Sequence, residues 1–366
     1  MSVEFIGYIG NNNSSETIPR IGPILDVDHV ATVAKAHELV GFDRALLAFH
    51  STLPDCLQVG QFAASVTERL NIFIAQRPGF TSPTLFARQF ATLDRLTKGR
   101  ISLNVITGGD SRELAQDGDT IEDKDERYAR TSEFLDVVRK EWTSETPFDH
   151  HGRFYTIKGG FSQIKPHRAE GIEVFIAGAS DAAVQVAGRH ADVFALWGET
   201  LDQVRELTGR VRATAHRNGR VTPRFSLSFR PILADTEEDA WVKAESILAR
   251  AKALIETSGY KNTGAPPPNE GSRRLLEVAG RKTALDRRLW TGIAELTGAK
   301  GNSTALVGTP DQVAEALLNY YDLGVDIFLV RGFNPLIDAI QYGRELIPRV
   351  KTLVAERERS RGLAAE

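Results

Sequence analysis

Three arginines and one turn of small residues are best suited, among the residues of this sequence, to chemistry on a negatively charged molecule. Arg230 and Arg331 each stand at or just beyond the end of a predicted strand, and Arg77 is a third candidate of this kind. A guanidinium group binds carboxylate, phosphate or sulfonate oxygens through a planar fork of N–H donors. A single arginine is more often a partner in a loop salt bridge. Several on one rim of a fold favour an anionic substrate.

A second candidate anion site is Gly178-Ala179-Ser180, which stands between a predicted strand and a predicted helix. Small residues let the backbone approach an anion closely, and the free N–H groups of the first helical turn bind phosphate. Ser180 has an equally good alternative use as a plain N-cap of that helix. The spacing alone leaves both interpretations open.

The segment 101–128 is a third region of interest. Its start, 101–106, is an apolar run typical of a strand that is buried on both faces. The chain then breaks at Thr107 and continues as a polar, acidic loop, about 108–125, before a helix predicted at 126–142. A loop of this length between a strand and a helix is usually functional. We therefore expect the chemistry to lie on this side of the fold.

Strands and helices alternate almost to the end of the chain. Eight strands are predicted, at 3–9, 44–49, 71–76, 101–106, 173–177, 192–196, 224–234 and 326–330. Eight strands that are each followed by a helix predict an α/β fold of the TIM (β/α)8 barrel type. An open doubly wound sheet is the alternative, but no GxGxxG motif follows the first strand.

In such a barrel the active site lies at the C-terminal ends of the strands. The residues predicted there are His50, Gln76, Arg77, Asn104, Thr107, Gly178, Ala179, Ser180, Trp197, Ser228, Arg230 and Arg331.

Two insertions are predicted in what we expect to be one domain, 1–366. The first is a hairpin at about 147–160, and its adjacent pair His150-His151 reads as an exposed turn rather than a metal site. The second, at about 258–304, is rich in glycine, proline, serine and basic residues, which is typical of a disordered segment or a mobile lid.

Composition excludes several classes of function. The net charge of −3 gives no reason to expect nucleic acid or an anionic membrane as a partner. No apolar run approaches a membrane span and no secretory signal is recognisable, so we expect a cytoplasmic protein. Cys56 is the only cysteine, which excludes an internal disulfide and a thiolate metal cluster. We expect no metal ligands.

Several motifs resemble one known family. The run INV-TGGD, then ELA-DGD and DERY, is similar to the alkanesulfonate monooxygenases of the bacterial luciferase-like superfamily. Further similar segments are TSPTLFARQFATLDRLTKGR, GASDAA, LWGE, STALVG-TPDQVAEAL and GRELIP. The resemblance extends from the first strand to about residue 350. It implies a flavin-dependent barrel that receives reduced FMN from a separate NAD(P)H:FMN reductase and uses oxygen in a water-excluded site.

The resemblance also implies roles for individual residues. Asn104 and Thr107 would lie by the isoalloxazine edge, and Tyr128 would reach the flavin phosphate or ribityl chain. Gly178, Ala179 and Ser180 would hold the phosphate, and Trp197 would line the cavity. Members of the family usually form homodimers or homotetramers, and the segment before Gly308 corresponds to their mobile lid.

The sequence departs from the family where the substrate would bind. The related sulfonate enzymes have Arg-Leu-His on the seventh strand, whereas this chain has Ser228-Phe229-Arg230. After the eighth strand they have Ser-Gly-Tyr-Pro-His, whereas this chain has Arg331 and four residues without the tyrosine and histidine. The lid arginine of the family has Lys300 as its nearest counterpart. Positive charge is moved to other positions rather than removed, which is consistent with an anionic substrate.

Three hypotheses of function follow. The favoured one is a two-component FMN-dependent monooxygenase of sulfur metabolism that oxidises a small organosulfonate and releases sulfite and an aldehyde. His50, Trp197, Arg230 and Arg331 would form its catalytic and substrate-binding set. The second is a monooxygenase of the same fold that acts on a sulfone, an amine or another small molecule. The third is a non-catalytic flavin-binding protein.

Overall fold

The computed structural model describes residues 2–258, 267, 269–280, 286, 288–299, 301 and 303–363. Contacts divide the chain into two units that are each assembled from separate stretches of sequence. The first unit contains Met1–Ala45, Ala195–Gly209 and Arg224–Glu366, and the second unit contains Leu46–Phe194 and Arg210–Pro223.

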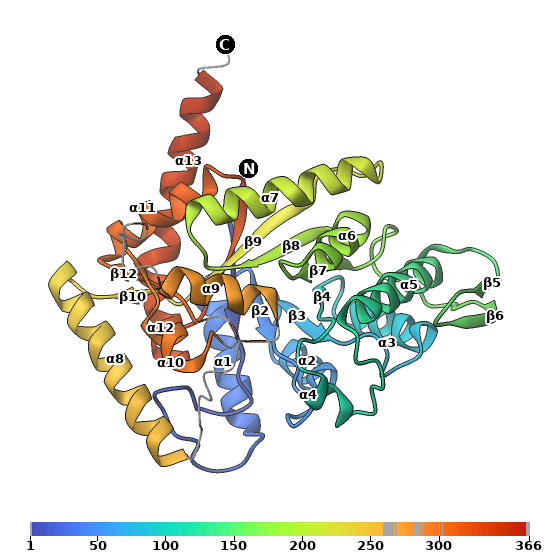
Figure 1. Cartoon of the computed structure of the whole chain (residues 1–366), viewed down its shortest axis with the longest axis horizontal. Coiled ribbons are helices and arrows are strands. Elements are labelled where there is room, and N and C mark those ends of the chain that lie inside the picture. The colour runs from blue at the N-terminus through green and yellow to red at the C-terminus, as the bar shows by residue number, and fades with distance from the viewer. Residues whose placement is uncertain are drawn as a thin grey trace. The chain divides into compact units, whose positions relative to one another are not determined.

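Eight parallel strands close into a barrel with helices between them (Figure 1). Around the barrel the strands are, in order, β1 (Glu4–Tyr8), β13 (Val325–Val330), β9 (Arg224–Phe229), β8 (Val193–Trp197), β7 (Glu173–Ala177), β4 (Ile101–Val105), β3 (Asn71–Gln76) and β2 (Arg44–Leu47). The predicted (β/α)8 barrel is confirmed, and the alternative of an open sheet is wrong.

The principal helices follow the strands at nearly the predicted places. They are α1 (Val27–Leu39), α2 (Cys56–Ser65), α3 (Pro83–Leu96), α5 (Lys124–Thr143), α6 (Asp181–His190), α7 (Leu201–Arg217), α8 (Glu237–Ser258), α11 (Pro310–Tyr321), α12 (Pro335–Gln341) and α13 (Ile347–Leu363). Side chains or proline mark several starts: Asp26, Asp55, Asp123 and Thr309 accept hydrogen bonds from N–H groups of the first turn.

In the first unit, a close contact with His37 on α1 shows which side chains of β1 point into the barrel. A Cβ atom added to Gly7 would fall 1.9 Å from the His37 ring, so Gly7 faces the helix. Because side chains alternate along a strand, Glu4, Ile6 and Tyr8 face the barrel interior. At the base of the barrel, Glu4 accepts hydrogen bonds from Arg44 and Arg224 at 2.9 and 2.7 Å. This pairing reads as structural support of the barrel.

In the second unit, the acidic loop predicted at 108–125 is held by two arginines of α5, of which Arg127 is buried and Arg130 is partly buried. It contains the short helix α4 (Ser111–Ala115). Arg130 pairs with Asp119 through two hydrogen bonds of 2.9 and 2.6 Å. Arg127 donates to the backbone oxygens of residues 121 and 122. The hairpin expected at 147–160 consists of β5 (Phe148–His151) and β6 (Thr156–Gly160), which are antiparallel and lie beside α5 (Figure 1).

Three elements differ from the predictions. The strand predicted at 224–234 ends at Phe229, and β10 (Ile232–Leu233) instead joins a small sheet with β12 (Ala305–Gly308) and β11 (Leu289–Trp290). Pro231 separates the two strands, and proline lacks the N–H donor that a continuous strand needs. The last helix, predicted at about 336–355, is interrupted by a π-helical turn, η1 (Tyr342–Leu346).

The third difference concerns the segment at 258–304, which was expected to be irregular. Its described residues include two helices, α9 (Glu270–Gly280) and α10 (Gly292–Thr297). Buried Leu275 and Ala294 give these helices an apolar contact that composition alone did not reveal. Lys300 and the rest of this prediction lie outside the described residues. Within the described part of the chain, no helix combines the length and apolar character of a membrane span.

Candidate functional site

The turn between β7 and α6 has the geometry of an anion site. Gly178 has a φ of +129°, and a Cβ added there would lie 2.6 Å from the Tyr128 hydroxyl. Only glycine fits this position without strain or displacement. Ser180 is the N-cap of α6, and its hydroxyl accepts a hydrogen bond from the Ala183 N–H at 3.4 Å. Both sequence interpretations of Ser180 are therefore compatible, because a capped helix start still presents free N–H groups.

Helix α5 brings the end of β4 together with this turn. Thr107, just beyond β4, has its hydroxyl 3.1 Å from that of Thr131 on α5. One turn earlier on the same helix, Tyr128 is buried against Gly178. Burial raises the pKa of Tyr128 to about 12, against a smaller lowering by the Ser180 hydroxyl. Tyr128 is therefore a neutral hydrogen-bond donor at Gly178-Ala179-Ser180, which we call the phosphate turn after its expected ligand.

Asn104 supplies a further polar group in the second unit. It lies on β4 opposite Phe175 of β7. Its Oδ1 atom is buried and has no hydrogen-bond partner among the described residues. A buried acceptor without a donor is costly, which favours a ligand N–H at this place. The buried Oδ1 of Asn104 fits an N–H group such as that of a flavin ring, and the cradle at Gly178 fits a phosphate.

His50 belongs to a polar cluster that the sequence revealed only in part. Its side chain is half-exposed, and its Nε2 lies 3.7 Å from the Glu113 carboxylate. The same carboxylate accepts hydrogen bonds from the Ser51 N–H at 2.9 Å and from Arg77 at 2.6 Å. Glu113 lies on α4, so it ties the acidic loop to the loop that carries His50. Arg77 is engaged here as an internal ion-pair partner.

The strand register of the first unit places Arg230 and Arg331 on the interior face of the barrel. Ile6, which faces the interior, pairs with Leu329, and Leu329 pairs with Ser228. Arg331 and Arg230 each lie two residues beyond these positions, and alternation therefore turns them to the same face. The Arg331 guanidinium accordingly lies over the Tyr8 ring, 4.8 Å from its centroid.

The two arginines converge on one carboxylate, that of Glu16 in the loop after β1. Arg230 donates to one Glu16 oxygen at 2.9 Å and Arg331 to the other at 2.8 Å. Arg230 is fully buried, stacks on the Phe333 ring at 3.7 Å, and also donates to the Gly332 oxygen at 3.1 Å. We call Glu16, Arg230 and Arg331 the arginine cluster. The sequence analysis expected Arg230 and Arg331 on one rim of the fold, but it did not identify Glu16 as their shared partner.

Electrostatics keep the arginine cluster charged. Burial alone would raise the pKa of Glu16, but Arg230 and Arg331 outweigh it and hold the pKa well below its usual range. Burial lowers the pKa of Arg230, although the group remains a strong base. Its Nε and Nη1 atoms have no hydrogen-bond partner among the described residues. The cluster therefore combines an incompletely satisfied buried cation with a carboxylate whose pKa is strongly lowered.

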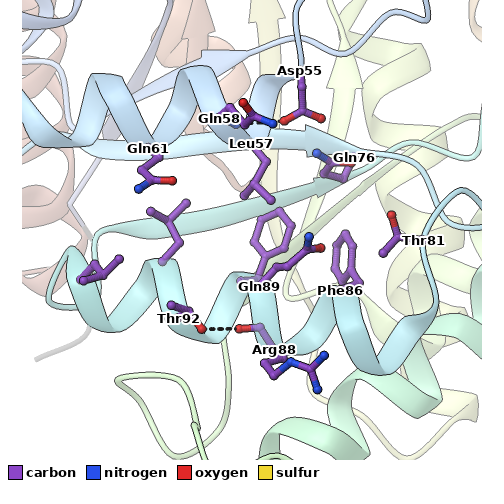
Figure 2. A pocket seen from close by; sticks show the side chains of 13 residues that line it. Asp55, Leu57, Gln58, Gln61, Gln76, Thr81, Phe86, Arg88, Gln89 and Thr92 are labelled. Carbon is purple, nitrogen blue, oxygen red and sulfur yellow. Dashed lines mark hydrogen bonds between the residues drawn. The ribbon is translucent and has the colours of Figure 1, made fainter.

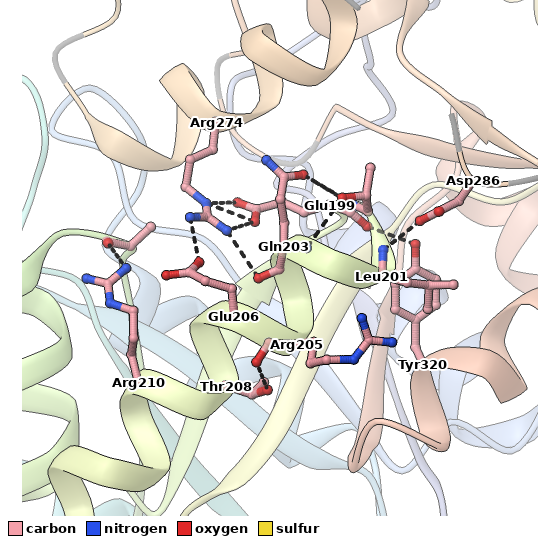
Figure 3. A network of polar contacts seen from close by, with 12 residues as sticks. Glu199, Leu201, Gln203, Arg205, Glu206, Thr208, Arg210, Arg274, Asp286 and Tyr320 are labelled. Carbon is pink, nitrogen blue, oxygen red and sulfur yellow. Dashed lines mark hydrogen bonds and ion pairs between the residues drawn. The ribbon is translucent and has the colours of Figure 1, made fainter. Parts of the chain in front are cut away.

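Trp197 lies under helix α9 of the same unit. A Cβ added to Gly271 would come within 3.0 Å of its ring, and Trp197 packs on the Leu275 cluster. Arg274 fixes α9 by donating to both oxygens of buried Glu199 at 2.7–3.0 Å, and to Glu206 at 2.9 Å (Figure 3). A described part of the predicted lid is thus a helix held by a bidentate ion pair.

A pocket of about 620 Å³ lies on the second unit between α2 and α3 (Figure 2). Its walls include Asp55, Leu57, Gln76, Phe86 and Phe90. Gln76 was predicted at the active end of the barrel, but it lines this helix-side pocket, and its amide donates to Cys56 Sγ at 3.6 Å. None of the other predicted site residues lines the pocket.

Three polar residues of these regions escaped the sequence analysis. Glu16 and Glu113 lie in polar loops where no pattern singles them out. Arg210 lies on α7, donates to Asp181 at 2.6 Å, and approaches the Ala179 oxygen at 3.4 Å. It places a cation at the phosphate turn. The available signal for Arg210 was Asp181 in the first turn of α6, because a carboxylate beside an expected anion site needs a nearby cation.

Comparison with known proteins gives the same fold. A family model described as luciferase-like monooxygenase matches residues 4–327. An EDTA monooxygenase (EmoA) from Chelativorans sp. BNC1 is similar in structure, with a TM-score of 0.79 and 20% identity over 96% of this chain and 94% of that one. A riboflavin lyase (RcaE) with modified FMN and riboflavin has a TM-score of 0.78 and 20% identity over 98% and 92%.

A third similar structure is a long-chain alkane monooxygenase (LadA), with a TM-score of 0.77 and 19% identity over 96% of this chain and 92% of that one. At these identities the likeness concerns the fold, and the substrates of the three proteins differ.

Proposed function

The chain belongs to the luciferase-like monooxygenase family, and from this premise we propose that it is a two-component, FMN-dependent monooxygenase that oxidises a small organosulfonate. Sulfite and an aldehyde are the products. Reduced FMN, delivered by a separate NAD(P)H:FMN reductase, supplies the two electrons that split oxygen, so that one oxygen atom enters the substrate and the other leaves as water. A homodimer or homotetramer is the expected assembly.

The phosphate turn supports the cofactor part of the proposal. Gly178, Ala179 and the N–H groups that follow Ser180 would hold the phosphate, with Tyr128 donating from α5. Asn104 and Thr107 would contact the flavin ring, where the free Oδ1 of Asn104 can accept an N–H. His50 and Trp197 stay predicted members of the catalytic set.

One observation carries the substrate part: Arg230 and Arg331 each give one hydrogen bond to the two oxygens of a single carboxylate. The pair therefore has the geometry that an oxyanion headgroup requires. Arg230 would act from a buried position, and Arg331, with a quarter of its side chain exposed, from the accessible side. Their joint role is to bind and orient the sulfonate rather than to transfer protons, since guanidinium groups stay protonated.

A specific observation also favours a second candidate, a monooxygenase of a neutral sulfone or an amine. Glu16 already accepts one hydrogen bond from each arginine, so their positive charge is partly neutralised without a substrate. A substrate without negative charge would leave this arrangement undisturbed. A non-catalytic flavin-binding protein remains the third candidate, and it would bind reduced FMN without oxygen-dependent turnover.

The deciding experiment supplies enzymatically reduced FMN and oxygen to the purified protein with methanesulfonate, longer alkanesulfonates, dimethyl sulfone and alkylamines. Sulfite release from a sulfonate is expected, and oxidised FMN without reductase is the control. Oxidation of the sulfone or amine without sulfite release would replace the sulfonate proposal with the second candidate. Oxygen consumption that no substrate accelerates would support the third.

A further inference from the structure

The arginine cluster holds two guanidinium groups and one carboxylate, so its formal net charge is a single positive charge. We propose that Glu16 determines the charge of the group that the cluster accepts: it admits a singly charged oxyanion such as a sulfonate and disfavours a doubly charged one such as a phosphonate. This inference deepens the proposed function, because it concerns the headgroup of the same substrate.

The two residues that flank Glu16 are both hydrogen-bonded to one carbonyl oxygen, that of Phe333. The Ser15 hydroxyl donates to this oxygen at 2.6 Å, and the Thr17 hydroxyl donates to it at 3.2 Å. Ser15 and Ile18 are also paired by backbone hydrogen bonds of 2.9 and 3.3 Å. Glu16 is therefore part of a short, anchored turn, and its carboxylate is built into the cluster rather than carried by a free loop.

Exposure defines the side from which a ligand can approach. Arg230 is enclosed, with the Phe333 ring on one face of its guanidinium. Arg331 and Glu16 remain 26% and 29% exposed at their side chains. An incoming anion would meet the Arg331 guanidinium next to the Glu16 carboxylate. A singly charged anion balances the net charge of the cluster. A doubly charged anion loses more hydration on entry and leaves the enclosed site with an uncompensated negative charge beside Glu16.

Burial makes this opposition effective. Charges in a site shielded from water interact more strongly than charges on an open surface. Both neighbouring arginines keep the pKa of Glu16 well below its usual range, so the carboxylate does not escape the repulsion by taking up a proton. Glu16 therefore stays ionised at neutral and alkaline pH, and the discrimination applies wherever the ligand carries its second charge.

Isothermal titration calorimetry with methanesulfonate and methylphosphonate tests the proposal at pH 9, where the phosphonate carries two charges. Titrations without flavin and with reduced FMN under anaerobic conditions use wild type, Glu16→Gln and Glu16→Ala. The wild type should bind the sulfonate about tenfold more tightly than the phosphonate. In both variants the preference should fall to about threefold or less, because the phosphonate gains more than the sulfonate.

Two controls separate charge from position. Glu16→Asp keeps the carboxylate, and Glu315→Gln removes one exposed negative charge from α11 of the same unit. Both should keep the wild-type preference. Glu16→Ala answers the question where Glu16→Gln fails to fold, since alanine leaves no polar group to compete for the arginines. An unchanged preference in folded Glu16 variants, or no binding of either anion to any protein, overturns the proposal.

The sulfite assay distinguishes this inference from the proposed function. A shift of anion preference in the Glu16 variants, together with no sulfite release from any sulfonate, would support the proposed role of Glu16 and count against the sulfonate monooxygenase. Sulfite release with an unchanged anion preference would do the reverse.

Discussion

The arginine cluster of the first unit and the phosphate turn of the second unit are both suited to negative charge, but they are built from different materials. The cluster uses buried side-chain cations, which need a counter-charge, and Glu16 supplies it. The turn uses backbone N–H groups and small residues, which carry only partial charges and need none. A site made of side-chain charges therefore contributes to stability and selectivity together, whereas a backbone site contributes mainly to affinity.

The sharpest way to break this comparison is to remove Arg230. Arg230→Met leaves Glu16 partly uncompensated in a buried setting, and should lower the free energy of unfolding by about 3–5 kcal/mol. The matched control is Arg349→Met, which breaks an exposed ion pair with Asp311 in the same unit and should cost about 0–1 kcal/mol. Urea unfolding monitored by circular dichroism measures both. Equal losses in the two variants would contradict the structural role of the buried pair.

Gly178→Ala tests the second region. The added Cβ would collide with the Tyr128 hydroxyl at 2.6 Å and with Ala183 at 2.8 Å, in a left-handed backbone conformation. Overpacking of this kind costs about 1–3 kcal/mol, so reduced FMN should bind about tenfold to a hundredfold more weakly. Anaerobic fluorescence titration measures the affinity. Gly209→Ala on α7, with open space around the new methyl group, should leave it unchanged.

Arg331→Ala sharpens the comparison from the accessible side of the cluster. It removes one charge-assisted hydrogen bond to the proposed headgroup, worth about 1.5–3 kcal/mol, and should weaken sulfonate binding at least about tenfold. FMN affinity should hardly change, because the phosphate turn is made of other residues. The exposed Arg20→Ala is the charge-matched control. If Arg331→Ala abolished flavin binding instead, the arginine would be a flavin ligand.

The two regions also differ in how far the sequence could predict them. The phosphate turn consists of consecutive residues between a strand and a helix, so Gly178 and Ser180 were recognisable from local pattern. Arg230 and Arg331 lie just beyond the ends of β9 and β13, although the strand predicted at 224–234 would have continued past Arg230. Their partner Glu16 lies 214 and 315 residues away, in a polar loop that no periodicity marks. The pairing depends on the barrel closing, which a linear pattern cannot express.

The same reasoning explains the elements that were missed. The alternating segment at 224–234 was predicted as one strand, but Pro231 interrupts it, and Ile232 belongs to a different sheet. Helix α9 was hidden in a segment whose composition suggested irregular structure. Its stability comes from Arg274 and from Leu275, which find Glu199 and Ala299 only in the folded chain. Local patterns predicted the frame of the fold, whereas contacts between distant segments decided these exceptions.

The smallest predicted effect concerns Tyr128, which borders the phosphate turn as a neutral donor. Tyr128→Phe removes one hydroxyl and keeps the ring that packs on Gly178, so it should weaken reduced FMN binding by about 0.5–1.5 kcal/mol, or roughly twofold to tenfold.

The pKa of the wild-type Tyr128 hydroxyl is raised to about 12, above the ordinary value of 10.0. The tyrosine therefore stays protonated in the folded protein, and its contribution to stability is lost only as the pH rises above 10 towards 12. FMN affinity of the wild type should accordingly show no step attributable to this hydroxyl between about pH 6 and 9, and the ratio of wild-type to Tyr128→Phe affinity should be constant over that range. A ratio that changes with pH would mean that the tyrosine ionises, and that the phosphate turn carries a full charge in the way the arginine cluster does.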